Sequence, residues 1–221
     1  MGKFNSSKCV VKPVFDELLK DNTLISFLKL VLPKRIDIGE IRNVRYEGHP
    51  REKSFAPAPE FLNWCRQHPD ELLNPELASE KVKVNPQYKF EGNTHPDVYI
   101  ETTKIRVVIE AKWTEPRITS HTTWRKEGER DQLIRHMDAL IPIQEDGDAP
   151  ISVFGLFIID AHGKISKSAL EGLFHSDWYY KVSLPHRVDD GKYRRVMNGF
   201  AGVFTWQYIK NQLGLSEPYF C

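Results

Sequence analysis

An apolar run at residues 151–159 constrains the fold more than any other segment of the chain. It reads ISVFGLFII, in which only a serine and a glycine interrupt the apolar residues. A run of this kind is typical of a strand buried on both faces, as in the parallel part of a mixed sheet. Since a sheet buried on both faces needs helices on both sides, the run predicts an α/β fold.

The composition agrees with one domain of this kind. The 221 residues are 40% hydrophobic and 11% aromatic, and 31 basic residues balance 30 acidic ones. A disordered chain would have fewer apolar residues and a less balanced charge. A chain of this length buries about 70% of the surface that its unfolded form exposes, so it needs no disulfide or structural zinc. We therefore predict a single domain over residues 1–221.

The sequence also predicts the compartment. Cys9, Cys65 and Cys221 are far apart and form no C-x-x-C pair, which favours free thiols in a reducing environment. The apolar stretch at residues 24–32 is too short to span a bilayer. No basic start leads into an apolar run with a cleavage site, so we expect no signal peptide. The expectation is a cytoplasmic protein with no membrane partner.

Further helices and strands follow from the periodicity of the apolar residues. Helices are predicted at residues 14–19, 23–32, 59–68, 126–141, 167–174 and 193–213, and a strand interrupted by Pro86 is predicted at residues 81–90. A hairpin is predicted at residues 97–113, where two extended runs are joined by residues 102–104. The central order is then helix, strand, strand, strand, helix, strand.

The second run of this hairpin has two different faces. Alternate residues from Ile105 onward are apolar and predict a core face, whereas Glu110 and Lys112 lie together on the other face. The plainer interpretation is an amphipathic hairpin whose Arg106, Glu110 and Lys112 face solvent.

The register of the hairpin decides whether two acidic residues meet. A three-residue loop leaves Asp97 opposite Ile109, on the wrong face. A one-residue bulge or a four-residue connection instead places Asp97 opposite Glu110. Pro96 lacks an N–H and would end the ladder there, which leaves Asp97 at an accessible strand end. Both registers remain open at this point.

In the second register the hairpin carries the groups that metal-assisted hydrolysis needs. The carboxylates of Asp97 and Glu110, the Ala111 carbonyl and water form an all-oxygen shell, which suits Mg²⁺ or Mn²⁺ better than zinc. Lys112 lies on the same face as Glu110, so it can orient an attacking water or offset the charge that builds on a phosphate. The hairpin therefore predicts hydrolysis of a phosphodiester.

The motif Pro96-Asp97…Glu110-Ala111-Lys112 resembles that of the PD-(D/E)XK, or restriction-endonuclease-like, nuclease superfamily. The predicted order of elements resembles the core of that superfamily, α-β-β-β-α-β with a mixed central sheet flanked by helices. The resemblance covers about residues 59–160, and it leaves an N-terminal helical extension at residues 1–48 and a C-terminal one at residues 161–221. It implies that Asp97 and Glu110 bind the metal and that Lys112 acts at the water and phosphate.

The resemblance also implies further site residues. Gln132 matches a polar position on the helix after the motif strand, but His136 stands where one version of the superfamily has a tyrosine. Glu60 is the candidate for an additional acid from the preceding helix. Arg117, Arg125 and Arg130 are expected to meet backbone phosphates. Arg187, in the cluster Ser-Leu-Pro-His-Arg, could touch a phosphate or simply belong to a turn.

The expected function is a Mg²⁺-dependent DNA endonuclease of the restriction or phage-defence type. Alternatives are a repair, junction-resolving or transposon-encoded nuclease, and a non-catalytic nucleic-acid-binding or assembly module on the same fold. Four tryptophans could stack on bases, although core packing is the usual role of such residues: Trp113, Trp124, Trp178 and Trp206. The sequence does not distinguish DNA from RNA. A homodimer would match the two-fold symmetry of a duplex site.

Overall fold

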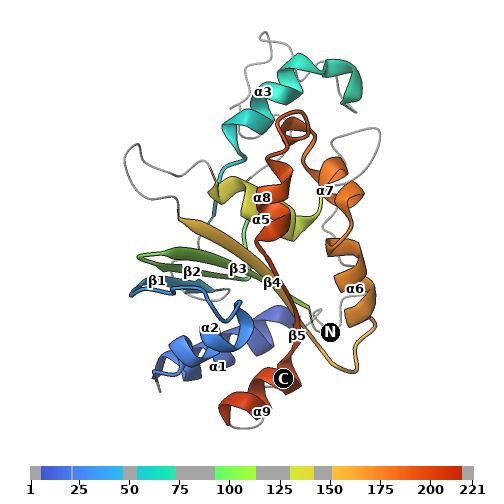
Figure 1. The fold of residues 1–221 in the computed structure, drawn as a ribbon. Helices are drawn as coiled ribbons and strands as arrows, with labels where there is room; N and C mark the ends of the chain where they lie inside the picture. Colours follow the sequence, from blue (N-terminus) through green and yellow to red (C-terminus); the bar gives the residue numbers. More distant parts are fainter. Residues whose placement is uncertain are drawn as a thin grey trace.

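The computed structural model describes residues 6–20, 22–46, 54–72, 93–112, 130–141 and 151–215. These residues form a five-stranded sheet with the order β1-β2-β3-β4-β5 (Figure 1). The strands are β1 (Ile41–Tyr46), β2 (Val98–Thr102), β3 (Ile105–Lys112), β4 (Ser152–Ile159) and β5 (Phe200–Thr205). Neighbouring strands are antiparallel from β1 to β3 and parallel from β3 to β5. The predicted α/β fold with a mixed sheet is confirmed.

Helices cover both faces of this sheet. One face carries α1 (Ser6–Lys20), α2 (Leu24–Val31) and α9 (Trp206–Leu213), and the other carries α5 (Gln132–Leu140), α6 (Lys167–Phe174), α7 (Asp177–Ser183) and α8 (Tyr193–Asn198). Figure 1 shows the first group below the sheet, and α3 (Pro59–Gln67) at the upper end of the molecule. Short 3-10 turns follow α3 and α7, at Pro69–Glu71 (η1) and Pro185–Arg187 (η3).

The apolar residues of the strands alternate between two cores. Val107 of β3 packs with the α1–α2 side, whereas Val108 packs with Leu133 of α5. Successive side chains of a strand point to opposite faces, so a strand between two helical layers is apolar at consecutive positions. The last six residues of β4 are all buried, which confirms the prediction made from the apolar run.

The β2–β3 hairpin adopts the register that places the two acidic residues opposite each other. Val98 pairs with Ile109 and Glu101 pairs with Arg106. Four residues, 102–105, therefore connect the two members of the last regular pair. The Thr102 hydroxyl stabilises this connection, because it accepts hydrogen bonds from the N–H groups of Lys104 and Ile105 at 3.0 and 2.9 Å. This side chain acts as a backbone acceptor within the turn.

The N-terminal part of the chain contributes a strand that we did not predict. β1 lies within residues 1–48, which were expected to be helical only, and its Tyr46 pairs with Val98 of β2. The strand is polar and its first two residues are exposed, as is usual at a sheet edge, so its periodicity is weak. Helices α1 and α2 pack directly on the sheet and belong to its core. The strand predicted at residues 81–90 lies outside the described residues.

The C-terminal part also differs from the expectation of helices only. The helix predicted at residues 193–213 is divided into α8, β5 and α9. Gly199 and Gly202 lie at this division, and the residues between and after them pair in parallel with β4, for example Val203 with Phe157. The extra strand covers the second edge of β4. The sheet therefore extends beyond the expected core of residues 59–160 on both sides.

Candidate active site

Strands β2 and β3 bring Asp97 to Glu110. Val98 pairs with Ile109, so Asp97, one residue before β2, stands opposite Glu110. Oδ2 of Asp97 accepts a hydrogen bond from the N–H of Ala111 at 2.7 Å. The side chain thus takes the place of a strand carbonyl and holds the two strands together beyond the end of the regular ladder.

The backbone carbonyl of Ala111 faces the same side. In a strand the N–H and C=O of one residue point to the same neighbour, and the N–H of Ala111 points to Asp97. Pro96 would face Ala111 if the ladder continued, but it has no N–H to donate. The Ala111 carbonyl therefore has no ladder donor from that residue and points to the same side of β3 as its N–H, toward Asp97.

Glu110 is almost fully buried and is held from two sides. Its Oε1 lies 2.5 Å from Nζ of Lys112, and its Oε2 lies 3.2 Å from Nε2 of His136. Burial alone raises the pKa of Glu110, but the hydrogen bond from His136 and the charge of Lys112 outweigh it, so the pKa lies below its ordinary value. Glu110 is therefore an ionised carboxylate at neutral pH.

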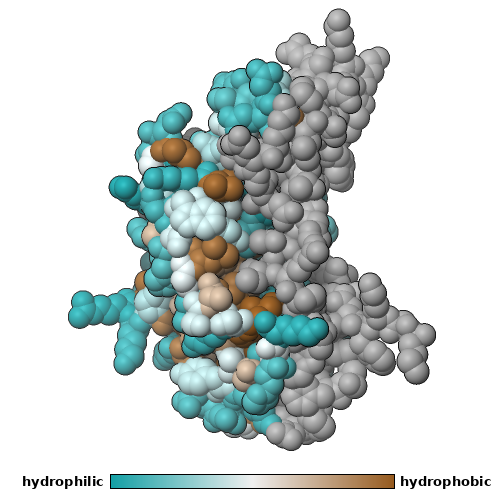
Figure 2. All heavy atoms as spheres, turned by 90° about the vertical axis from the view of Figure 1, so that its right-hand side faces the viewer, coloured by the Kyte–Doolittle hydropathy of each residue, from teal (hydrophilic) through white to brown (hydrophobic). Residues whose placement is uncertain are grey.

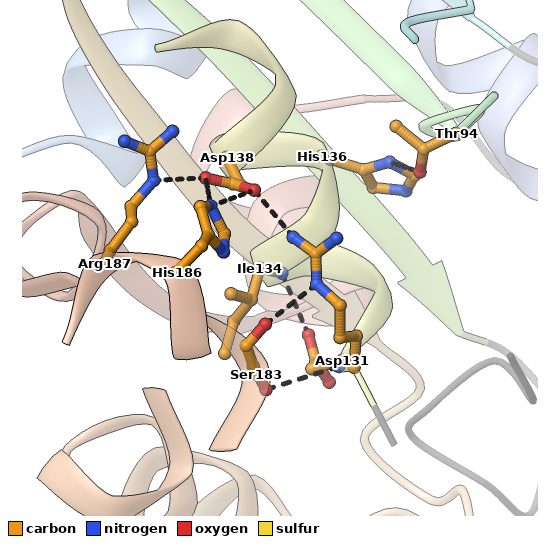
Figure 3. Close-up of polar contacts among 9 residues, drawn as sticks. Thr94, Asp131, Ile134, His136, Asp138, Ser183, His186 and Arg187 are labelled. Atoms are coloured by element: carbon orange, nitrogen blue, oxygen red, sulfur yellow. Dashed lines mark hydrogen bonds and ion pairs between the residues drawn. The ribbon is translucent and has the colours of Figure 1, made fainter. Parts of the chain in front are cut away.

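His136 comes from α5, which packs over this face of the sheet. Burial lowers the pKa of His136 despite the nearby Glu110 carboxylate, so the ring is neutral near pH 7. An ionised carboxylate only accepts hydrogen bonds, so Nε2 of His136 carries the proton and donates it. Nδ1 then accepts from the hydroxyl of Thr94, 2.5 Å away (Figure 3). The nuclease motif predicted no role for this histidine, because one version of the superfamily has a tyrosine at that position.

Lys112 places the site at the carboxyl end of the parallel strands. Its side chain is 12% exposed, and its carbonyl accepts from the N–H of Asp160, directly after β4, at 3.2 Å. A cavity of about 440 Å³ lies at the ends of β4 and β5, and neither Asp97, Glu110 nor Lys112 lines it. Its lining includes Asp160, Ser166, Lys167, Glu171 and Thr205. In open α/β sheets this edge is the usual place for ligands.

Gln132 and Glu60 are not joined to the site by contacts within the described ranges. Gln132 is the first residue of α5, one turn before His136, and is partly exposed. Glu60 lies in the exposed first turn of α3. No hydrogen bond from either side chain to another described residue is found. Both assignments stay predictions.

The arginines expected to meet phosphates have a different position where they can be described. Arg130 and Arg187 are 1% and 3% exposed, and both bind the buried Asp138, at 2.6 Å from Arg130 Nη2 and 2.5 Å from Arg187 Nε (Figure 3). The Arg130 guanidinium also lies 4.0 Å from the ring centre of Phe61. Burial argues against phosphate contacts of both residues. Arg117 and Arg125 lie outside the described residues.

Asp131 is a further buried carboxylate that the sequence did not single out. It caps α5 by accepting from the N–H of Ile134 at 3.0 Å, and it accepts from the Tyr179 hydroxyl at 2.9 Å. Burial, with a smaller contribution from the charge of Glu110, raises the pKa of Asp131 to about 6. A capping residue before an apolar helical stripe is the signal that could have found it.

The residues present fit a magnesium-type site better than a closed metal cage. No group of three or more His, Cys, Asp or Glu side chains arranged for a metal occurs among residues 6–20, 22–46, 54–72, 93–112, 130–141 and 151–215. Mg²⁺ is usually bound by one or two carboxylates and keeps several waters or substrate oxygens. Asp97, Glu110 and the Ala111 carbonyl match that donor set.

Of the tryptophans considered for base stacking, Trp178 is 59% exposed on α7, whereas Trp206 is buried. Trp113 and Trp124 lie outside the described residues. Figure 2 shows the side of the molecule on which α6 and α7 lie, where hydrophobic residues are interspersed with hydrophilic ones.

Comparison of the chain with models of known families, with curated proteins and with solved structures finds no match. Within the part of the chain that the structure describes, no helix combines the length and apolar character needed to cross a membrane. The geometry of the site is therefore the basis for assigning a function.

Proposed function

We propose that this protein is a metal-dependent endonuclease that hydrolyses phosphodiester bonds in DNA. The register of β2 and β3 carries the proposal, because it sets Asp97 opposite Glu110, with Lys112 bound to the latter. Two carboxylates beside an ammonium suit phosphoryl chemistry, in which negative charge builds on the phosphate oxygens. The likeness of the Pro96-Asp97…Glu110-Ala111-Lys112 motif to the PD-(D/E)XK nucleases supports the same reaction.

The order of elements gives this proposal further support. Helix α2 is followed by β1, β2, β3, α5 and β4, with α3 inserted after β1. This is the helix, strand, strand, strand, helix, strand order expected of a restriction-endonuclease-like core, although the first helix and strand come from segments other than the predicted ones.

Each residue of the site has a part in the proposed reaction. Asp97, Glu110 and the Ala111 carbonyl would hold Mg²⁺ or Mn²⁺. A divalent cation bound by these residues would supply an activated water and would neutralise phosphate charge. Lys112 would donate to a phosphate oxygen or orient the attacking water. Its ammonium has three N–H donors, so one can stay on Glu110 while another reaches the substrate.

Cleavage of supercoiled plasmid by the purified protein tests the proposal. Reactions with Mg²⁺, Mn²⁺ or EDTA are compared for the wild type, Lys112→Ala and Asp97→Asn. Lys104→Ala is the matched control, because Lys104 is an exposed lysine in the turn of the same hairpin, at the end remote from the site. We expect nicking or linearisation that needs metal, is lost in the two site variants and is retained in the control.

Two results would contradict a nuclease. Cleavage that survives in the Asp97→Asn, Lys112→Ala double variant would come from another site or a contaminant. A wild-type protein that cuts no plasmid, single-stranded DNA, branched DNA or RNA with either metal would exclude the activity. Cleavage of RNA alone would change the substrate class and keep the mechanism.

A non-catalytic nucleic-acid-binding module is the second candidate. The observation that favours it is the pairing of both Glu110 oxygens with protein groups, Lys112 and His136. In such a module the two acids would stabilise the fold. Thermal unfolding separates the two functions, because a ligand that binds only the folded state raises the melting temperature. Added Mn²⁺ should raise it for an enzyme and leave a binding module unchanged.

A further inference from the structure

Thr94, His136 and Glu110 form a chain of hydrogen bonds that joins three separate segments. The Thr94 hydroxyl lies 2.5 Å from Nδ1 of His136, and Nε2 of the same ring lies 3.2 Å from Oε2 of Glu110. All three side chains are buried, with relative exposures of 5%, 0% and 1%. Buried polar groups that are fully paired hold a single arrangement, because any other would leave a group without a partner.

We propose that His136 is a positioning residue that sets both carboxylates of the metal site, Glu110 directly and Asp97 through Thr94. This inference rests on the proposed nuclease function and names a residue that the motif alone does not assign. His136 acts through the two acids and does not touch the substrate.

The Glu110 side chain has to keep one orientation when substrate binds. Its carboxylate has two protein partners, Lys112 on one oxygen and His136 on the other. Lys112 shares its N–H donors between Glu110 and the phosphate in the proposed reaction. His136 is then the contact that keeps Glu110 in one orientation, from a helix that packs on the sheet through Leu133 and Met137.

The segment that precedes Asp97 is held through Thr94. Thr94 precedes it by three residues, and the backbone of Thr94 is tied to Phe55 by two hydrogen bonds, at 3.0 and 2.8 Å. The hydroxyl of Thr94 adds a third anchor, on α5. The segment that enters β2 is thus fixed to the same imidazole ring that holds Glu110. Partners of metal ligands in such outer positions commonly set metal affinity.

Binding of Mn²⁺ to the purified protein without DNA tests this inference, with free Mn²⁺ followed by electron paramagnetic resonance. His136→Leu and Thr94→Val remove the hydrogen bonds at similar volume, and we expect each to weaken Mn²⁺ binding, by about 10- to 100-fold for His136→Leu. His136→Gln keeps an N–H donor of similar reach and should retain most of the affinity. Met137→Ala is the control, because it loosens the same helix next to His136 without touching Glu110.

Melting temperatures of all variants separate positioning from general stability. Loss of Mn²⁺ affinity in His136→Leu but not in Met137→Ala, at similar melting temperatures, with rescue by His136→Gln, supports the inference. Wild-type Mn²⁺ affinity in His136→Leu and Thr94→Val would overturn it and leave the proposed nuclease standing. A wild-type protein that binds no Mn²⁺ and cuts no nucleic acid would overturn both.

Discussion

At the scale of single residues, buried charges are concentrated under α5 and η3. Asp138 binds Arg130, His186 and Arg187, which come from different segments (Figure 3). Burial alone raises the pKa of Asp138, but His186 and the two guanidinium groups lower it far below its ordinary value. The carboxylate is therefore ionised at neutral pH, and it compensates the buried positive charges of Arg130 and Arg187.

Replacing Asp138 should be strongly destabilising. Asp138→Asn leaves Arg130 and Arg187 buried without a counter-charge, so we expect the free energy of unfolding to fall by about 3–5 kcal/mol. Urea unfolding measures it. Asp190→Asn is the control, because it removes an exposed ion pair with Lys192 and should change little. An Asp138→Asn protein as stable as the wild type would contradict this assignment.

Asp131 should make the protein less stable as the pH rises, because its pKa is raised in the folded state, whereas that of Asp138 is lowered. Its pKa in the folded protein is about 6, above the ordinary 3.8, so the folded state keeps a proton that the unfolded state loses. Stability therefore falls as pH rises from about 4 to about 6 and stays reduced above that range. Asp131→Asn keeps an oxygen that can cap Ile134 and cannot ionise.

We expect Asp131→Asn to raise the free energy of unfolding at pH 8, by on the order of 2–3 kcal/mol. The gain should nearly disappear near pH 3, which lies below the ordinary pKa of 3.8, so that Asp131 is mostly protonated in both states. Urea unfolding at the two pH values measures the difference. An equal effect of the substitution at both pH values would show that ionisation of Asp131 is not its cause.

At the scale of elements, the sheet and the helices on the α5 side approach closely at glycines. A Cβ added at Gly199, after α8, would lie 2.3 Å from the backbone oxygen of Val153. A backbone atom within the β4 ladder cannot move aside cheaply, so the close approach requires glycine. By contrast, a Cβ at Gly172 in α6 meets no atom within 4 Å.

These two glycines predict opposite effects of alanine. Gly199→Ala should lower the free energy of unfolding by about 1–3 kcal/mol, because the added methyl forces strand and helix apart. Gly172→Ala should raise it by about 0.5–1 kcal/mol, because alanine is the better helix former. Thermal or urea unfolding of both variants measures the contrast, and a neutral Gly199→Ala would show that the sheet can shift here.

At the scale of the whole molecule, the C-terminal elements β5 and α9 pack into the central sheet and its core. Trp206 and Ile209 of α9 are buried in the same core as α2 and the sheet, and β5 pairs with β4. Figure 1 shows α9 beside α1 and α2 below the sheet. The C-terminal elements are therefore part of the domain.

A chain that ends at residue 160 should not fold. It lacks β5, α9 and the helices α6 to α8, so β4 would become an exposed apolar edge strand, which promotes aggregation. We expect no cooperative thermal transition and loss of near-ultraviolet circular dichroism relative to the full chain. A soluble fragment with a sharp transition would restore the expectation that residues 161–221 are an addition outside the core.

Local sequence patterns were sufficient to predict several helices and strands. Strand β4, the β2–β3 hairpin, α3 and α6 were predicted because each has its period or its boundary signals within a short segment. β5 was missed because its apolar residues also fit a helical stripe that continues from α8, and β1 because an edge strand needs few apolar residues. Both strands exist through pairing with a neighbour distant in sequence.

The site likewise combines features predictable from local sequence with contacts that depend on tertiary packing. The residues themselves identified Asp97, Glu110 and Lys112 as a set, since spacing along one hairpin limits them to two registers. The choice between those registers came from the Thr102 turn, and the His136 contact joins positions 26 residues apart. Periodicity acts between near neighbours in the chain. The pairing of buried charges, such as Arg187 with Asp138, depends instead on which segments pack together, because packing brings distant residues within hydrogen-bonding distance.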